Sequence, residues 1–135
     1  MAEYELEKPR SGTVLELKRV DEKEFYRNLK SLDNKGKFPL ALAAGKEYGL
    51  FVENGNVIGY VQGSNELSRV DGFAIHQDYR GKGYGKLAIE QLKTTVKKNG
   101  NSLVVCAFPT AYKFFQKCGL AMVDHEPGEV WLADV

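Results

Sequence analysis

Hydrophobic and polar positions alternate along parts of the chain, and these stretches predict strands. Residues 13–17 alternate as a half-buried strand does, and residues 48–53 and 56–61 are two further strand-like runs. The Asn-Gly pair between those two runs favours a type I′ hairpin, because both central residues of that turn need a positive φ. A third run, 68–75, is expected to pair beside the second.

Other stretches carry apolar residues at helical spacing. Phe25, Leu29 and Leu32 follow a segment that resembles a capping box, with Asp21 at the N-cap and Glu24 three residues later. Residues 39–44 predict a second, short helix. A longer helix follows a glycine-rich loop at 76–83, and its buried face is marked by Gly85, Ala88, Ile89, Leu92 and Val96.

The C-terminal third predicts a strand, a helix and a hairpin. The continuous apolar run 103–107 is typical of a strand buried on both faces. A helix over about 110–117 and a hairpin joining 120–123 to 130–132 complete the order β-α-(α)-β-β-β-α-β-α-β-β. This order predicts a single α/β domain of the α+β type.

The composition of the chain predicts one N-terminal domain boundary and excludes several classes of protein. Residues 1–12 are polar and predict a flexible arm, so the domain is expected to span 13–135. A formal net charge of +1 argues against a nucleic-acid binder, and no run approaches the ~20 apolar residues of a membrane span. The N-terminus has no apolar signal core, and two cysteines without a His cluster predict neither a disulfide framework nor a metal site. A cytoplasmic location is therefore expected.

One segment carries most of the chemical information. Glycines alternate with other residues in the run from Arg80 to Lys86, between a predicted strand and a predicted helix. Because glycine has no Cβ, successive backbone N–H groups of this run can approach an anion closely. The N-terminus of the following helix and three cations lie at the same turn, so together these features predict a cradle for a diphosphate. The spacing fits neither a Walker loop, because Leu87 stands where a hydroxyl is needed, nor the dinucleotide fingerprint.

The same segment resembles a known family. Arg80-Gly81-Lys82-Gly83-Tyr84-Gly85 is similar to the Arg/Gln-x-x-Gly-x-Gly/Ala signature of the GNAT superfamily of N-acetyltransferases, and the element order agrees from about Thr13 to Leu132. The resemblance implies a mixed, mostly antiparallel twisted sheet of six to seven strands flanked by helices. It also implies that the sheet is splayed between the strand before the signature helix and the strand after it.

The resemblance further implies a cosubstrate and its contacts. Acetyl-CoA would donate an acetyl group, without a metal, to a primary amine of a small molecule or peptide. The pantetheine would pair with the strand at Phe73, Ala74 and Ile75. The diphosphate would be held by Arg80, Gly81, Lys82, Gly83, Tyr84, Gly85 and Lys86. Dimers are common among members, so a homodimer is expected by analogy alone.

Two residues are candidates for catalysis. Asp71 shares strand parity with Phe73 and Ile75, which predicts that it faces the same side and acts as the base, through a water. Relatives often carry a Tyr where this chain has Phe115, so Tyr112, one helical turn earlier, is the candidate for protonating the leaving thiolate. The alternatives are a structural ion pair for Asp71 and simple packing for Tyr112.

Other interpretations stay open at this stage. One alternative is a CoA-binding module whose activity has decayed, which is suggested by Phe115 and by Phe108 in place of an Asn common in relatives. An anion-binding interaction domain unrelated to CoA is a third hypothesis. His76 is expected to order the loop, Cys106 to be a small core residue, and Trp131 to be either core or a substrate wall.

Overall fold

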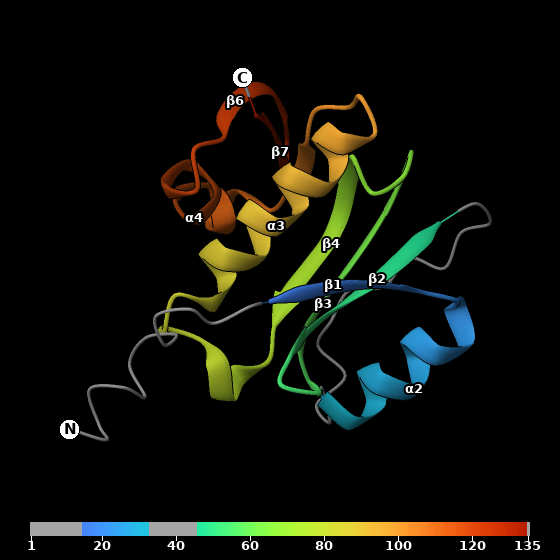
Figure 1. Cartoon of the computed structure of the whole chain (residues 1–135). Helices are drawn as coiled ribbons and strands as arrows, with labels where there is room; N and C mark the ends of the chain where they lie inside the picture. Colours follow the sequence, from blue (N-terminus) through green and yellow to red (C-terminus); the bar gives the residue numbers. More distant parts are fainter. Residues whose placement is uncertain (1–14, 33–45, 135) are drawn as a thin grey trace.

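The computed structural model describes residues 15–32 and 46–134 (Figure 1). Its centre is a seven-stranded sheet in the order β1-β2-β3-β4-β5-β7-β6. The strands are β1 (Glu16–Val20), β2 (Glu47–Glu53), β3 (Asn56–Ser64), β4 (Arg69–Ile75), β5 (Val104–Ala107), β6 (Ala121–Glu126) and β7 (Glu129–Ala133). The helices are α2 (Glu22–Leu32), α3 (Tyr84–Lys98) and α4 (Tyr112–Lys117), with short 3₁₀ turns η1 (Gln77–Tyr79) and η2 (Pro109–Ala111).

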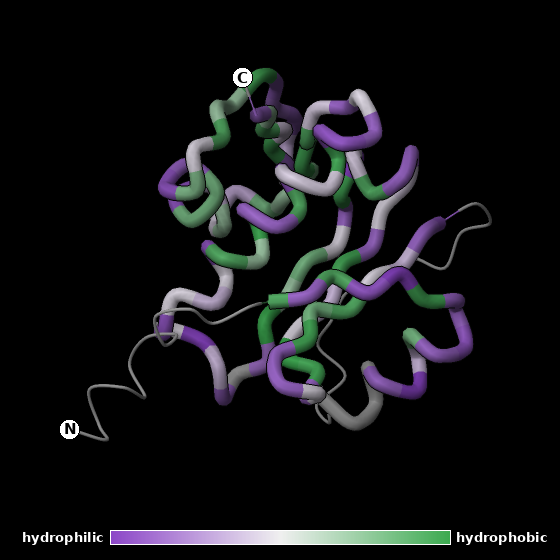
Figure 2. Tube along the Cα trace, viewed as in Figure 1, coloured by the Kyte–Doolittle hydropathy of each residue, from purple (hydrophilic) through white to green (hydrophobic). Residues whose placement is uncertain are grey.

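The two faces of the sheet carry separate hydrophobic clusters. On β2, Phe51 belongs to a large cluster that includes the buried face of α3, whereas its neighbour Leu50 belongs to a smaller one with Phe25 of α2. Since successive residues of a strand point to opposite faces, α3 and α2 lie on opposite sides of the sheet. Figure 2 shows hydrophobic segments along the central strands, with hydrophilic ones prominent along α2.

The local signals for the start of α2, the first hairpin and most of the buried face of α3 are confirmed. Asp21 Oδ1 accepts a hydrogen bond of 2.8 Å from the amide of Glu24, which caps α2. Asn54 and Gly55 both have positive φ, 50° and 80°, as the turn between β2 and β3 requires. All the expected buried positions of α3 are buried except Gly85, which is half-exposed and contacts α4 instead.

The sheet opens in the middle. All neighbouring strands pair antiparallel except β4 and β5, which run parallel and pair only at Arg69 with Val104 and Val70 with Val105. Beyond Val70, the edge of β4 that faces β5 has no paired strand in the described part of the chain. The predicted splay is therefore confirmed, and the mixed seven-stranded sheet flanked by helices agrees with the expected fold class.

Four expectations need correction or lie outside the described residues. The first strand begins at Glu16, later than expected, and runs to Val20. β5 is buried on one face only, because Val105 packs under α3 while Val104 and Cys106 on the other face are half-exposed. The expected arm at 1–12 and the short helix at 39–44 fall outside the described residues.

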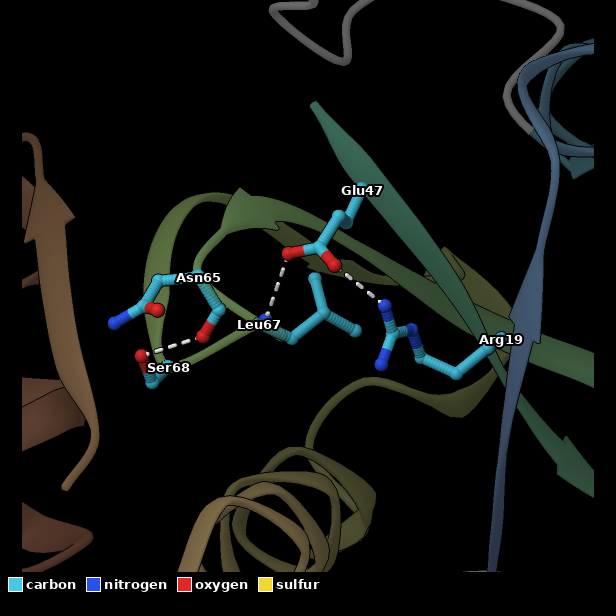
Figure 3. A network of polar contacts seen from close by, with 5 residues as sticks. All are labelled: Arg19, Glu47, Asn65, Leu67 and Ser68. Atoms are coloured by element: carbon cyan, nitrogen blue, oxygen red, sulfur yellow. Dashed lines mark hydrogen bonds and ion pairs between the residues drawn. The ribbon is translucent and has the colours of Figure 1, made fainter. Parts of the chain in front are cut away.

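The connection from β3 to β4 is a turn of left-handed backbone. Asn65, Glu66 and Leu67 have φ of 53°, 58° and 63°, a conformation that costs non-glycine residues free energy. The Leu67 side chain is fully buried, and its amide donates to Glu47 Oε1 at 3.2 Å (Figure 3). Glu47 also accepts from Arg19 at 2.6 Å, so this network ties the turn to the start of β2.

No helix in the described ranges is long and apolar enough to cross a membrane.

Candidate active site

The glycine-rich loop has the backbone that an anion cradle requires. Gly81 and Gly83 have φ of 75° and 88°, in the left-handed region where a Cβ is unfavourable. Gly83 is also the N-cap of α3 and offers no side-chain cap, so the first N–H groups of the helix are not satisfied by it. The positive end of the α3 dipole also lies at this loop, where it favours an anionic ligand.

Side chains of the glycine-rich loop stabilise its conformation through hydrogen bonds to neighbouring residues. Arg80 donates from Nε to the carbonyl oxygen of Ile75 at 2.6 Å, and Lys82 donates to the carbonyl oxygen of Asp78 at 3.0 Å. Tyr84 is buried, and its hydroxyl lies 3.0 Å from Glu53 Oε1. For these three residues, the structure therefore shows side-chain contacts that order the loop, and their part in binding a cofactor stays a prediction.

His76 also orders the loop, as expected. Its backbone amide donates to the carbonyl oxygen of Ile58 at 2.7 Å, and its Nδ1 accepts from the amide of Asp78 at 3.2 Å. Because Nδ1 is engaged by a backbone donor, the ring is fixed at the end of β4. Both contacts hold the turn that leads into the glycine-rich loop.

An aromatic wall lies on the α3 side of the open edge of β4. Phe73 packs against Phe51, and its ring is stacked on Phe114 with centroids 6.1 Å apart. Phe114 also contacts Gly85, where an added Cβ would come within 2.9 Å of its ring. Phe114 was not among the predicted site residues, although it directly precedes Phe115 in the segment that the sequence singled out. The glycine at 85 is therefore required for close contact with α4.

The predicted orientation of Asp71 is wrong. Gln62 pairs with Gly72 and Gly63 pairs with Val70, so Asp71 is an extra, bulged residue with no partner on β3. Val70 and Ile75 are five residues apart, yet both belong to the hydrophobic cluster on the α3 side. The extra residue in the bulge therefore changes which residues of β4 face the same side of the sheet. Asp71 instead forms contacts on the α2 side, where Lys46 Nζ pairs with Oδ2 and Gln62 Nε2 donates to Oδ1 at 3.1 Å.

Gln62 is the main site residue that sequence reasoning missed. It is only 1% exposed, and its Oε1 has no hydrogen-bond partner among the described residues. Because a carboxylate only accepts, the nitrogen of the amide must face Asp71 and the oxygen must face away. Nearby, burial raises the pKa of the Tyr48 phenol, and the charges of Glu22 and Asp71 add to this, so the phenol stays neutral.

A gap separates β4 from β5 beyond Val70, and a second group of polar side chains lies on its far side, on β5 and β7. Cys106 donates from its thiol to Glu129 Oε2 at 3.3 Å, and Arg69 lies 5.3 Å from the centre of the Trp131 ring. Burial, then the hydrogen bond and charge of Glu129, raise the pKa of the Cys106 thiol to about 11. Cys106 is half-exposed on the uncovered face of β5, which corrects its expected place in the core. Trp131 lies on this same face rather than in the core.

Two aromatic residues of α4, Phe115 and Tyr112, differ in their burial. Phe115 is buried and contacts the ring of Phe73 at 6.0 Å, whereas Tyr112 is half-buried at the first position of α4. Phe108, at the end of β5, is 61% exposed. Tyr112 packs against the large cluster and stays a prediction as the proton donor. In the described part of the chain, no group of three or more metal-binding side chains occurs.

Comparison with known proteins agrees with this geometry. Residues 12–120 match the sequence model of the acetyltransferase (GNAT) family. Comparison with functionally described sequences yields no significant match.

Solved structures share the fold at low identity. A spermidine N-acetyltransferase chimera from Vibrio cholerae and hSSAT is 12% identical with a TM-score of 0.67, and covers 88% of this chain and 94% of its own. An acetyltransferase from Thermus thermophilus is 19% identical with a TM-score of 0.65, at 89% and 96% coverage. The Campylobacter jejuni N-acetyltransferase PseH in complex with acetyl coenzyme A is 16% identical with a TM-score of 0.57, at 89% and 97% coverage. The family match spans most of the sequence, and this chain therefore belongs to the acetyltransferase (GNAT) family of acyltransferases.

Proposed function

We propose that this protein is an N-acetyltransferase that moves the acetyl group of acetyl-CoA to a primary amine by direct attack. The observation that carries the proposal is the open edge of β4, which begins after Val70 and leads to the cradle at Gly81 and Gly83. An extended pantetheine arm can pair with that edge as an added strand would, while the diphosphate meets the loop and the start of α3. The related PseH structure contains acetyl coenzyme A, which supports this cosubstrate.

In this mechanism, the thioester lies near the point where β4 and β5 diverge. An alkyl ammonium with a pKa of about 10.4 must lose a proton before it attacks, and Asp71 is the base, directly or through a water. Backbone N–H groups of β4 near Phe73 and Ile75 stabilise the developing oxyanion. The Tyr112 hydroxyl, or water, then protonates the departing thiolate.

The acceptor amine reaches Asp71 from the α2 side of the sheet. Both described contacts of the carboxylate come from this side, from Lys46 and Gln62. Half-exposed Glu129 and Trp131 lie on the same uncovered face, beyond the gap. The acceptor is therefore a small molecule or a peptide amine that enters over β3, β4 and β7.

Calorimetry with acetyl-CoA, followed by CoA release across a panel of primary amines, tests the proposal. Binding together with transfer to at least one amine is the expected result. Binding without transfer to any amine would favour a CoA-binding module, for which the buried Phe115 in place of a tyrosine is the supporting observation. Absence of binding would exclude both.

A further inference from the structure

The side-chain amine of Lys46 lies on the carboxylate of Asp71, where the gap between β4 and β5 begins. We propose that Lys46 is itself an acetyl acceptor, so that the protein acetylates its own Lys46 from bound acetyl-CoA. This inference rests on the proposed function, because it uses the same cosubstrate and the same base. The Lys46 amine contacts the carboxylate of the proposed base, and an external amine would have to bind in the same place.

Two sets of contacts hold Lys46 in this place. Its Nζ pairs with Asp71 Oδ2, while Gln62 fixes the other carboxylate oxygen. The Lys46 side chain is only 20% exposed, so the amine is confined. The next residue, Glu47, is held by Arg19 and by the amide of Leu67 (Figure 3), which fixes the start of β2.

Other lysines with carboxylate partners lie elsewhere. In the described ranges, Lys18 pairs with Glu24, and Lys93 pairs with Glu90 within α3. Neither pair involves a residue of β4 or β5. Lys93 is a useful comparison, because its side chain is 14% exposed and thus as confined as Lys46.

The reaction balances without a further reactant. The Lys46 ammonium loses one proton to solvent by way of Asp71, and the neutral nitrogen attacks the thioester carbonyl carbon. The carbon–sulfur bond breaks, and its electron pair leaves with the CoA sulfur. The second proton passes from nitrogen to that thiolate, so the products are an amide on Lys46, free CoA thiol and one proton. Holding the amine beside the base replaces a bimolecular encounter with an intramolecular step.

The test incubates the full chain with acetyl-CoA and no added amine, followed by intact-mass measurement and peptide mapping over time. We expect one acetyl group on Lys46, appearing at least about tenfold faster than on Lys93, Lys97 or Lys98. The rate constant should not depend on protein concentration, since the step is intramolecular. Lys46→Arg should remove the modified peptide, and Asp71→Asn should slow its appearance on the order of 10²-fold.

The lysines of α3 serve as controls within the same molecule, so the result does not depend on whether a variant folds. Acetyl transfer to an added amine with Lys46 unmodified, or modified no faster than Lys93, would overturn self-acetylation and leave the proposed function standing. A rate constant proportional to protein concentration would also overturn it, because one molecule would then be modifying another. Failure of the chain to bind acetyl-CoA in calorimetry would instead remove the proposed function, and this inference with it.

Discussion

Gln62 donates a hydrogen bond of 3.1 Å from Nε2 to Oδ1 of Asp71, although Gln62 itself is almost completely buried. The bond holds one carboxylate oxygen in place on the α2 side of the sheet. At the same time, Oε1 of the amide is buried without a partner among the described residues, and such a group destabilises the fold. The residue therefore has opposite effects on stability and on the proposed base.

Gln62→Leu should separate these effects. The change removes the unpartnered oxygen, so the free energy of unfolding should stay the same or rise by up to about 1 kcal/mol in urea titration. Loss of the donor should lower kcat/KM for the amine roughly tenfold or more, with acetyl-CoA affinity unchanged, because the Asp71 carboxylate is then no longer held in one position. Tyr26→Phe, which removes a second buried polar atom that has no partner among the described residues, is the control and should leave kcat/KM unaltered. Equal kcat/KM in both variants would contradict a role for Gln62 at Asp71.

Asp71→Asn should lower kcat/KM by about 10²-fold or more near neutral pH, because the amide cannot accept the proton of the attacking amine. The acidic limb of the pH–rate profile should change as well. Asp71→Asn also releases Lys46, so the single variant Lys46→Met is needed to measure the loss of the ion pair alone. If Asp71→Asn and Lys46→Met behave alike and the profile keeps its shape, Asp71 is a structural partner of Lys46.

Gly83→Asp should weaken acetyl-CoA binding by on the order of 2 kcal/mol or more, since it places a Cβ and a negative charge at the N-cap of α3. Gly100→Asp is the matched control, because Gly100 has a similar φ of 78° and lies beyond the other end of the same helix. Both variants place an Asp side chain, with its negative charge, on a backbone of similar positive φ. Calorimetry that finds equal affinity for the two would place the diphosphate elsewhere.

Tyr112→Phe should reduce kcat with acetyl-CoA affinity nearly unchanged, if the Tyr112 hydroxyl protonates the thiolate. A thiolate is a tolerable leaving group, so the loss should be about 10²-fold at most. Phe115→Tyr should restore part of it in the double variant, because Phe115 occupies the position where the family resemblance leads us to expect a tyrosine, and it contacts Phe73. An intact kcat in Tyr112→Phe would indicate water as the proton source.

Cys106 should react slowly with thiol reagents despite its exposure. With a pKa of about 11, only about one thiol in a thousand is ionised at pH 8. Glu129→Gln removes the carboxylate that accepts from the thiol and repels the thiolate, so the pKa should fall and alkylation by iodoacetamide should accelerate several-fold. The measurement uses a Cys118→Ser background to remove the second thiol. Unchanged alkylation would mean that burial alone raises this pKa.

Local patterns in the sequence accounted for most of the fold. The cap at Asp21 and the Asn54-Gly55 turn depend on contacts within a few residues and are as expected, and the helical periodicity of α3 marked its buried face except at Gly85. The conformation of the glycine-rich loop also follows from the local sequence. Gly81 and Gly83 need positive φ for reasons that act on the backbone at those positions.

Only the tertiary structure decided what faces the gap. Parity along β4 predicted Asp71 beside Phe73, but the bulge at Asp71 depends on how β4 pairs with β3, and one extra residue moves the side chain to the opposite face. Lys46 and Gln62 meet Asp71 from two other strands or their ends, at separations of 25 and 9 residues along the chain. The sequence by itself determined the element types, the loop and the family resemblance, because these follow from local backbone and periodicity. The partners of the candidate base follow from strand register, which is set by the packing of the whole sheet.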